Sequence, residues 1–305
     1  MIDVDVNTSW MDAMRRGDFA AAWEISDAVL RTRGVRDQDH VPRWLQSVWD
    51  GTSLVGKRVL VRCYHGLGDT IQFIRYAPLL KEIATEVIVW TQPSLIPLLR
   101  TAKGIDRLIP LHDGAPEVEY DVDLELGELP YVFRNTLANI PARVPYLYVE
   151  PLPLARNERL RVGLIWESGE WDNRRSVPFA EIKRLGQLRD IQWHILQREP
   201  LRAGWDRSFG LISGGDNPLD DARMMRAMDL VISVDTMTAH LAGALGQNTW
   251  TLLPFDADWR WLQHRSDSPW YPTMRLFRQK TDGRWDTVVD ELARELGPEK
   301  AQKRT

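Results

Sequence analysis

"RCYHGLGDTIQFIRY", residues 62–76, joins an apolar run to a helical pattern through a turn that holds two glycines and one acid. The apolar run, 58–64, is predicted to be a buried strand, and the helix after the turn extends to about residue 83. Two further strands, 86–92 and 106–111, are predicted on either side of a helix over 94–101. Strands that alternate with helices in this way are typical of a parallel α/β sheet.

The alternation restarts after "IPARVPYLYVEPLPLARNE" (140–158), whose four prolines predict a linker. Strands are expected at 161–168, 191–197, 209–213, 229–234, 248–255 and 274–279, and helices at 178–189, 220–228, 236–246 and 285–296. We therefore expect two Rossmann-like domains, at 57–150 and 155–297, which bind ligands at the carboxyl ends of their strands.

Residues 9–33 precede both halves and are predicted to form two short helices broken at Gly17-Asp18. They resemble a single tetratricopeptide unit, and no second copy follows. Because one unit cannot bury its apolar face alone, this extension (1–50) is expected to dock on the main body or on a partner protein.

The composition excludes several classes of protein. A net charge of −4 does not indicate a basic surface that would bind nucleic acid. Cys63 is the single cysteine, which excludes internal disulfide frameworks and cysteine-cluster metal sites. The sequence shows neither a secretion signal nor an apolar stretch near the ~20 residues of a membrane span, so a cytoplasmic location is expected. The count of 14 tryptophans is unusual, and the tryptophan-rich stretch 259–270 is expected to pack in the core or to offer an aromatic wall to a sugar.

Three interpretations of the turn at 66–69 compete. A dinucleotide fingerprint requires a third glycine where Ile71 stands, and a Walker loop requires a Lys-Ser/Thr pair that is absent. A capping box formed by Asp69 and Gln72 accounts for the acid but not for Gly66 and Gly68. A carboxylate at such a turn can also act as a general base, so capping and catalysis both remain open.

A second turn of the same kind lies in "LVISVDTMTAHLAGALG" (230–246), where a strand ends at Val234. The start of the following helix offers free N–H groups and a positive dipole end to an anion, together with the hydroxyl and imidazole groups of Thr236, Thr238 and His240. Asp235 either caps this helix or accepts hydrogen bonds from sugar hydroxyls. Arg174 and Arg175, in the loop "WESGEWDNRRSVPF" (166–179), either neutralise phosphate or are simply solvated.

Together, "GLGDTIQFIRYAPLL", "RVGLIWESG…RRSVPF", "DLVISVDTMTAHLAGALG" and "LLPFDADWRWLQHRSDSPWYPTMRLFRQ" resemble glycosyltransferase family 9, the heptosyltransferase-like enzymes. The resemblance covers roughly residues 57–296 and is closest to the branch whose catalytic region follows tetratricopeptide repeats. It implies an α/β, GT-B-like architecture of two facing Rossmann-like domains, with no cofactor and no metal. Where that branch often has Glu-Gln before the Gly turn, this chain has Tyr64-His65.

The resemblance also implies roles for individual residues. Asp69 matches the proposed catalytic base. Donor-binding positions are Ser168, Arg174, Arg175, Gln197, Asp235, Thr236, Met237, Thr238 and His240, and acceptor-side positions are His65, Gly66, Gly68 and Gln72.

The expected function is metal-independent, inverting transfer of a sugar from a nucleotide-diphosphate sugar, with ADP-heptose as a candidate donor. The acceptor is a hydroxyl of a glycan, a lipid-linked glycan or a protein. The alternative is a catalytically silent nucleotide-sugar sensor or scaffold that contacts proteins through its N-terminal helices. Asp256-x-Asp258 is the one pair of acids that resembles a metal-binding motif on paper, and it is interpreted as a loop before a helix.

Overall fold

Contacts between residues divide the chain into two compact units. The first comprises 1–148 with 258–264, and the second comprises 149–257 with 265–305. The short segment 258–264 thus packs with the first unit, although the sequence prediction assigned it to the C-terminal domain. The computed structural model describes residues 4–33, 42–43, 46–155, 158–169 and 172–297.

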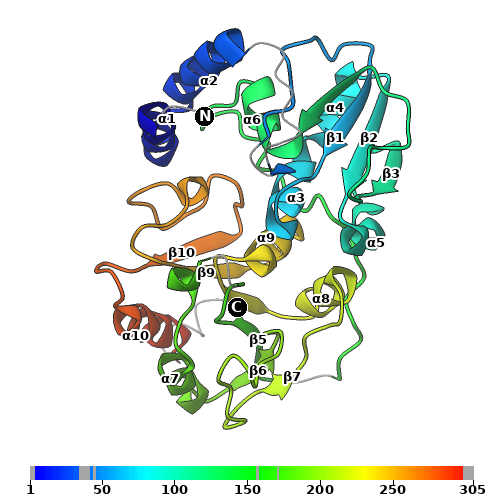
Figure 1. The fold of residues 1–305 in the computed structure, drawn as a ribbon. Helices are drawn as coiled ribbons and strands as arrows, with labels where there is room; N and C mark the ends of the chain where they lie inside the picture. Colours follow the sequence, from blue (N-terminus) through cyan, green and yellow to red (C-terminus); the bar gives the residue numbers. More distant parts are fainter. Residues whose placement is uncertain (1–3, 34–41, 44–45, 156–157, 170–171, 298–305) are drawn as a thin grey trace. The chain divides into compact units, whose positions relative to one another are not determined.

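The first unit contains a sheet of four parallel strands in the order β3-β2-β1-β4 (Figure 1). Its strands are β1 (Arg58–Arg62), β2 (Glu86–Thr91), β3 (Arg107–Pro110) and β4 (Val122–Glu125). β4 was not predicted from the sequence. It pairs with β1 so that Arg62 lies opposite Glu125, and the carboxyl ends of these two strands are therefore neighbours.

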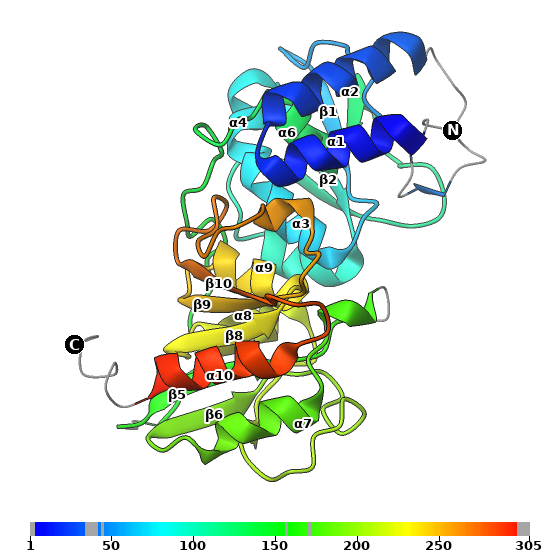
Figure 2. The same ribbon diagram turned by 90° about the vertical axis from the view of Figure 1, so that its left-hand side faces the viewer.

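Two helices, α1 (Val4–Arg16) and α2 (Phe19–Arg33), precede this sheet and lie side by side (Figure 2). The chain turns between them at Gly17, whose φ of 78° favours glycine, so the predicted break is confirmed. Trp23 is buried, and its indole Nε1 donates a hydrogen bond of 2.6 Å to the carbonyl of Asn135. The pair is thus docked on the first unit. Its assignment as a tetratricopeptide unit stays a prediction.

The remaining α-helices of the first unit are short. They are α3 (Leu67–Phe73), α4 (Ala77–Ile83), α5 (Ile96–Leu99) and α6 (Leu129–Val132). The single helix predicted from the Gly turn to about residue 83 is divided into α3 and α4 by a 3₁₀ turn. Pro78 in the first turn of α4 explains the division, because proline lacks the N–H that a continuous helix needs.

The second unit contains six parallel strands in the order β10-β9-β8-β5-β6-β7. They are β5 (Leu160–Ile165), β6 (Ile191–Ile195), β7 (Leu211–Ile212), β8 (Leu230–Val234), β9 (Thr249–Leu253) and β10 (Met274–Arg278). α7 (Phe179–Ile182) and α10 (Trp285–Leu296) cover one face, and α8 (Pro218–Met225) and α9 (Met237–Ala244) lie on the other (Figures 1 and 2). Parallel sheets in both halves confirm the predicted α/β, Rossmann-like class.

Tryptophans account for much of the core. Trp90, Trp166, Trp261 and Trp270 are among the largest fully buried side chains, which confirms core packing for two of the three tryptophans of the 259–270 stretch. Trp259, by contrast, lies at a cavity in the first unit, described below. None of the helices in the described part of the chain has the length and apolar character that crossing a membrane requires.

Candidate functional site

The turn that follows β1 is closed by Asp69. α3 begins at Leu67 with Gly66 as its N-cap, and Asp69, the third helical residue, accepts a hydrogen bond of 3.0 Å at Oδ2 from the Gly66 N–H. The predicted capping role is therefore present in a different form, because Asp69 is not the N-cap and Gln72 is not its partner. A Cβ on Gly66 would lie 3.2 Å from Asp69 Oδ2, so glycine at this position leaves room for the carboxylate.

The other carboxylate oxygen of Asp69 forms an ion pair with Arg260 Nη2. Arg260 also pairs with Asp258 at 2.9 Å, so the 258–264 segment brings a guanidinium to the Gly turn. The Asp69 side chain remains 29% exposed, which leaves it accessible to a small molecule. Asp69 therefore both closes the turn and presents an accessible carboxylate.

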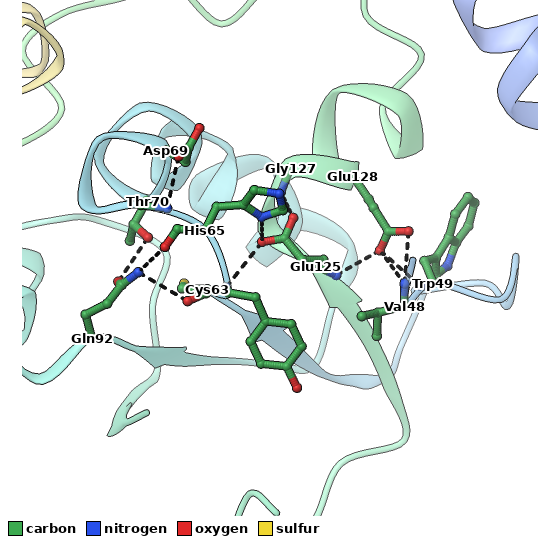
Figure 3. Close-up of polar contacts among 12 residues, drawn as sticks. Val48, Trp49, Cys63, His65, Asp69, Thr70, Gln92, Glu125, Gly127 and Glu128 are labelled. Atoms are coloured by element: carbon green, nitrogen blue, oxygen red, sulfur yellow. Dashed lines mark hydrogen bonds and ion pairs between the residues drawn. The ribbon is translucent and has the colours of Figure 1, made fainter. Parts of the chain in front are cut away.

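A second acid, Glu125, stands beside the turn (Figure 3). It ends β4, the neighbour of β1, and its Oε1 lies 2.9 Å from His65 Nδ1. The Glu125 side chain is only 3% exposed, whereas that of His65 is 39% exposed. The hydrogen bond that His65 donates to Glu125 raises the pKa of His65, with a smaller contribution from Asp69, against the opposing effects of burial and Arg260.

Gln92, the residue after β2, also holds the backbone of the turn. Gln92 Nε2 donates to the carbonyl oxygens of Cys63, at 3.2 Å, and His65, at 2.7 Å, and its Oε1 accepts from Thr70 Oγ1 at 3.0 Å (Figure 3). These contacts fix the position of His65. Gln72, predicted on the acceptor side, is fully buried in α3.

His65, Asp69, Glu125 and Arg260 line one cavity of about 400 Å³. All of its lining residues belong to the first unit. The structure thus brings the predicted residues His65 and Asp69 together with two residues that the sequence prediction missed.

In the second unit, strand pairing brings two loops to one edge of the sheet. β5 and β8 are neighbours, with Ile165 opposite Ser233, so the loops that follow them emerge together. Arg175, from the first of these loops, donates through Nη1 to the backbone carbonyl of Asp235 at 3.0 Å. Arg175 therefore contacts the residue that precedes the N-cap of α9, and its role in donor binding stays a prediction.

The start of α9 has no side-chain cap. Its N-cap is Thr236, in extended conformation, and no side chain accepts a hydrogen bond in the capping position. Asp235, offered as a capping residue by one interpretation of the sequence, is therefore not the cap. The amides of Met237 and Thr238 head the first turn of the helix, where backbone N–H groups are available to an anion.

Asp235 and His240 are buried beside this helix start. His240 Nδ1 lies 2.9 Å from the Tyr271 hydroxyl, and its Nε2 lies 4.0 Å from Asp235 Oδ1. Arg278, at the end of β10, was not predicted as a site residue. Burial lowers the pKa of Arg278, and the nearby Asp235 carboxylate partly opposes this effect.

Three residues that were predicted to bind the donor make contacts with other residues of the second unit. Arg174 is 65% exposed and pairs with Asp172 at 2.8 Å. Gln197 Oε1 accepts hydrogen bonds from two backbone N–H groups after β5, and Ser168 Oγ donates to the Asp172 carbonyl at 3.1 Å. These contacts shape the loop, and the role of the three residues in donor binding stays a prediction.

Within the described ranges, no group of three or more histidine, cysteine, aspartate or glutamate side chains is arranged to hold a metal ion. Asp258, from the Asp256-x-Asp258 pair, accepts at Oδ1 from the backbone N–H of Arg260 and from its guanidinium.

Comparisons with known proteins bear on the fold. No protein-family model matches the chain. Protein FlbA of Caulobacter vibrioides is 26% identical over 289 residues, and the match covers 81% of this chain and 48% of FlbA. The chain thus spans about half the length of this curated relative.

Three solved structures are similar. A family 9 glycosyl transferase from Veillonella parvula matches with a TM-score of 0.54 and 13% identity, over 75% of this chain and 87% of its own. ADP-heptose LPS heptosyltransferase II of E. coli matches with a TM-score of 0.56 and 15% identity, over 81% of this chain and 100% of its own. TibC, an iron-containing dodecameric glycosyltransferase of E. coli H10407, matches with a TM-score of 0.50 and 13% identity, over 78% of this chain and 67% of its own. This chain therefore has the α/β, GT-B-like fold of the heptosyltransferases of glycosyltransferase family 9.

Proposed function

We propose that the chain transfers a sugar from a nucleotide-diphosphate sugar to a hydroxyl acceptor, with inversion and without a metal ion. The observation that carries the proposal is the pairing of Arg175 with the uncapped start of α9 in the second unit. A guanidinium beside a helix N-terminus is suited to the two negative charges of a diphosphate. The fold match with an ADP-heptose heptosyltransferase makes ADP-heptose the first donor to test.

The donor half of the reaction requires that the leaving diphosphate be stabilised. The bond between the anomeric carbon and the phosphate oxygen breaks, and its electron pair leaves with the nucleotide diphosphate. Arg175 and the amides of Met237 and Thr238 neutralise the charge that develops there, which is the task that a metal ion performs in other enzymes. Arg278 is a further cation near Asp235.

The acceptor half requires a base. The acceptor oxygen attacks the anomeric carbon as its proton passes to a carboxylate, and Asp69 is the group we assign to this step. Its 29% exposure permits contact with a small molecule, and its other carboxylate oxygen lies in an ion pair with Arg260.

Calorimetric binding of ADP to Arg175→Ala and Arg189→Ala tests the donor site. Arg175→Ala is expected to raise the Kd for ADP roughly 10- to 100-fold, the scale of one charge-assisted contact. Arg189→Ala is the control, because Arg189 is an exposed arginine of the second unit outside the loops of the site. An unchanged Kd in Arg175→Ala would remove this residue from the site, and a wild-type chain that binds neither ADP nor any other nucleotide diphosphate would contradict the proposed function.

The rival function, a silent sensor of nucleotide sugars, predicts the same binding without turnover. Release of nucleotide diphosphate from a bound nucleotide sugar separates the two.

A further inference from the structure

The segment 258–264, which packs in the first unit, carries backbone strain. Leu262 has φ 51° and ψ −178°, close to a region that is essentially restricted to glycine, and His264 also has a positive φ, of 56°. Strained conformations persist where the surrounding structure holds them, and they cluster at functional sites. The contacts that hold this segment are therefore a guide to its role.

The N-terminal helices provide such contacts. The Trp10 ring on α1 meets the Trp259 ring edge-on, with centroids 5.9 Å apart, and the Phe19 ring on α2 does the same at 6.3 Å. The backbone N–H of Gln263, which lies between the two strained positions, donates to the Arg15 carbonyl at 3.1 Å. Both helices thus support the segment, at one aromatic ring and at its backbone.

Trp259 in turn holds the guanidinium of Arg260. The Arg260 Cζ lies 4.8 Å from the centroid of the Trp259 ring and 5.3 Å from that of the Phe73 ring on α3. The two rings are nearly parallel, with an interplanar angle of 16°. Asp258 accepts a hydrogen bond of 2.9 Å from Arg260 Nη1. Two aromatic rings and a carboxylate thus fix a cation whose side chain is only 16% exposed.

Both oxygens of the Asp69 carboxylate are restrained as a result. Oδ2 accepts from the Gly66 N–H, and Oδ1 pairs with Arg260 Nη2. Each oxygen of an ionised carboxylate has two lone pairs, so it can accept a further hydrogen bond from a hydroxyl while it is held. Orientation matters for such a group, because a misplacement of about 1 Å can lower a rate roughly 100-fold.

We propose that Arg260 is a positioning residue for Asp69 and that the N-terminal helix pair keeps it in place through Trp259. The proposal rests on the proposed function, because it takes Asp69 as the base. Each step of the path from the helices to the carboxylate is a direct contact within the first unit. On this account the helix pair affects turnover through the position of one guanidinium.

A double-mutant cycle on the turnover of ADP-heptose tests this path. The variants are Arg260→Ala, Trp10→Leu and the double variant, and Arg31→Ala, at an exposed position of α2, is the control that should keep the wild-type kcat. We expect Arg260→Ala to lower kcat roughly 10- to 100-fold and Trp10→Leu to lower it about threefold or more, with the Kd for ADP unchanged. The double variant should have the kcat of Arg260→Ala, because the helices act through the guanidinium that is already removed.

The contrary results of the cycle address the two halves of the proposal. A double variant whose loss in kcat is the product of the two single losses would overturn the path from the helices. A kcat of Arg260→Ala equal to that of wild type would overturn the role of Arg260.

Added guanidinium ions distinguish positioning from packing. Arg260 lines the cavity of the first unit, so a small cation can reach the space that its side chain leaves. We expect millimolar guanidinium chloride to raise the kcat of Arg260→Ala several-fold, whereas sodium chloride at the same concentration should not, and wild type should respond to neither. No response of Arg260→Ala to guanidinium would mean that this residue acts by packing and would overturn its positioning role.

Denaturant unfolding of the same variants keeps the two proposals separate, because free energies of unfolding are measured without donor or acceptor. Trp10→Leu should destabilise Arg260→Ala less than it destabilises wild type, since the ring contacts of Trp259 then hold no cation. A wild-type chain without turnover would contradict the proposed function alone. Additive free energies of unfolding in the double variant would overturn the link between the helices and Arg260.

Discussion

At the scale of single residues, two ion pairs lie at the Gly turn, Glu125 with His65 and Asp69 with Arg260. Sequence patterns identified His65 and Asp69 because both lie next to the glycines of the turn. They did not identify Glu125, whose partner is about sixty residues away in the chain. Only the pairing of β4 with β1 brings the two together.

The His65 pair has a consequence for stability that depends on pH. Because Glu125 raises the pKa of His65, the folded chain holds this proton more tightly than the unfolded chain. The resulting stabilisation is complete below the ordinary histidine pKa, and it is lost as the pH rises through the raised value. The difference in free energy of unfolding between wild type and His65→Gln is therefore expected to be larger at about pH 6 than at about pH 8.5.

Denaturant titrations at the two pH values measure this difference. Glutamine keeps an N–H donor for Glu125, so the comparison isolates the charge. His264→Asn, at an exposed histidine, is the control. A His65 difference that is the same at both pH values would mean that Glu125 does not hold a proton on this imidazole.

At the scale of elements, the important feature is a helix whose first turn is left open. α9 starts directly after the buried strand β8, and its N-cap residue Thr236 makes no side-chain cap. Uncapped helix starts leave N–H groups to be satisfied by water or by a ligand. A phosphate is the ligand that the helix dipole favours.

Met237→Pro tests one of these amides by removing the N–H of residue 237. Met237 is the first residue of α9, where proline is tolerated, and the extended φ and ψ of Thr236 suit a residue before proline. The melting temperature should therefore change little, while loss of one N–H to the phosphate raises the Kd for ADP roughly 10- to 100-fold. Met237→Ala is the control, since it keeps the N–H. Equal ADP affinity in all three proteins would show that the α9 start does not bind the diphosphate.

Elements differed in how well the sequence predicted them. β8 and α9 were predicted because a fully buried strand reads as a continuous apolar run and Gly, Ala and Leu crowd the helix after it. β4 was missed because four residues with alternating Val122 and Leu124 carry a weak signal. Contacts between side chains, such as Gln92 with the Gly turn, leave no periodic trace in a sequence and could not be predicted.

At the scale of the whole molecule, two parallel sheets and a docked helix pair make up the chain. Alternating strands and helices predicted both sheets, because this rhythm has few topological solutions. The place of 258–264 in the first unit could not be predicted, since it depends on the contact of Arg260 with Asp69 and that of Gln263 with Arg15. The first unit therefore joins residues from separate parts of the sequence.

The most direct test of the account is release of ADP from ADP-heptose in excess EDTA, with a sugar acceptor present, by wild type and Asp69→Asn. Asparagine can still accept the hydrogen bond from Gly66 but loses the ion pair with Arg260, so the melting temperature and the Kd for the donor are measured beside kcat. We predict turnover by wild type in EDTA and a fall in kcat of roughly 10²- to 10⁴-fold in Asp69→Asn, the range that loss of a general base produces. A wild-type chain that binds ADP-heptose but releases no ADP, with or without added metal ions, would contradict the account and identify the protein as a sensor.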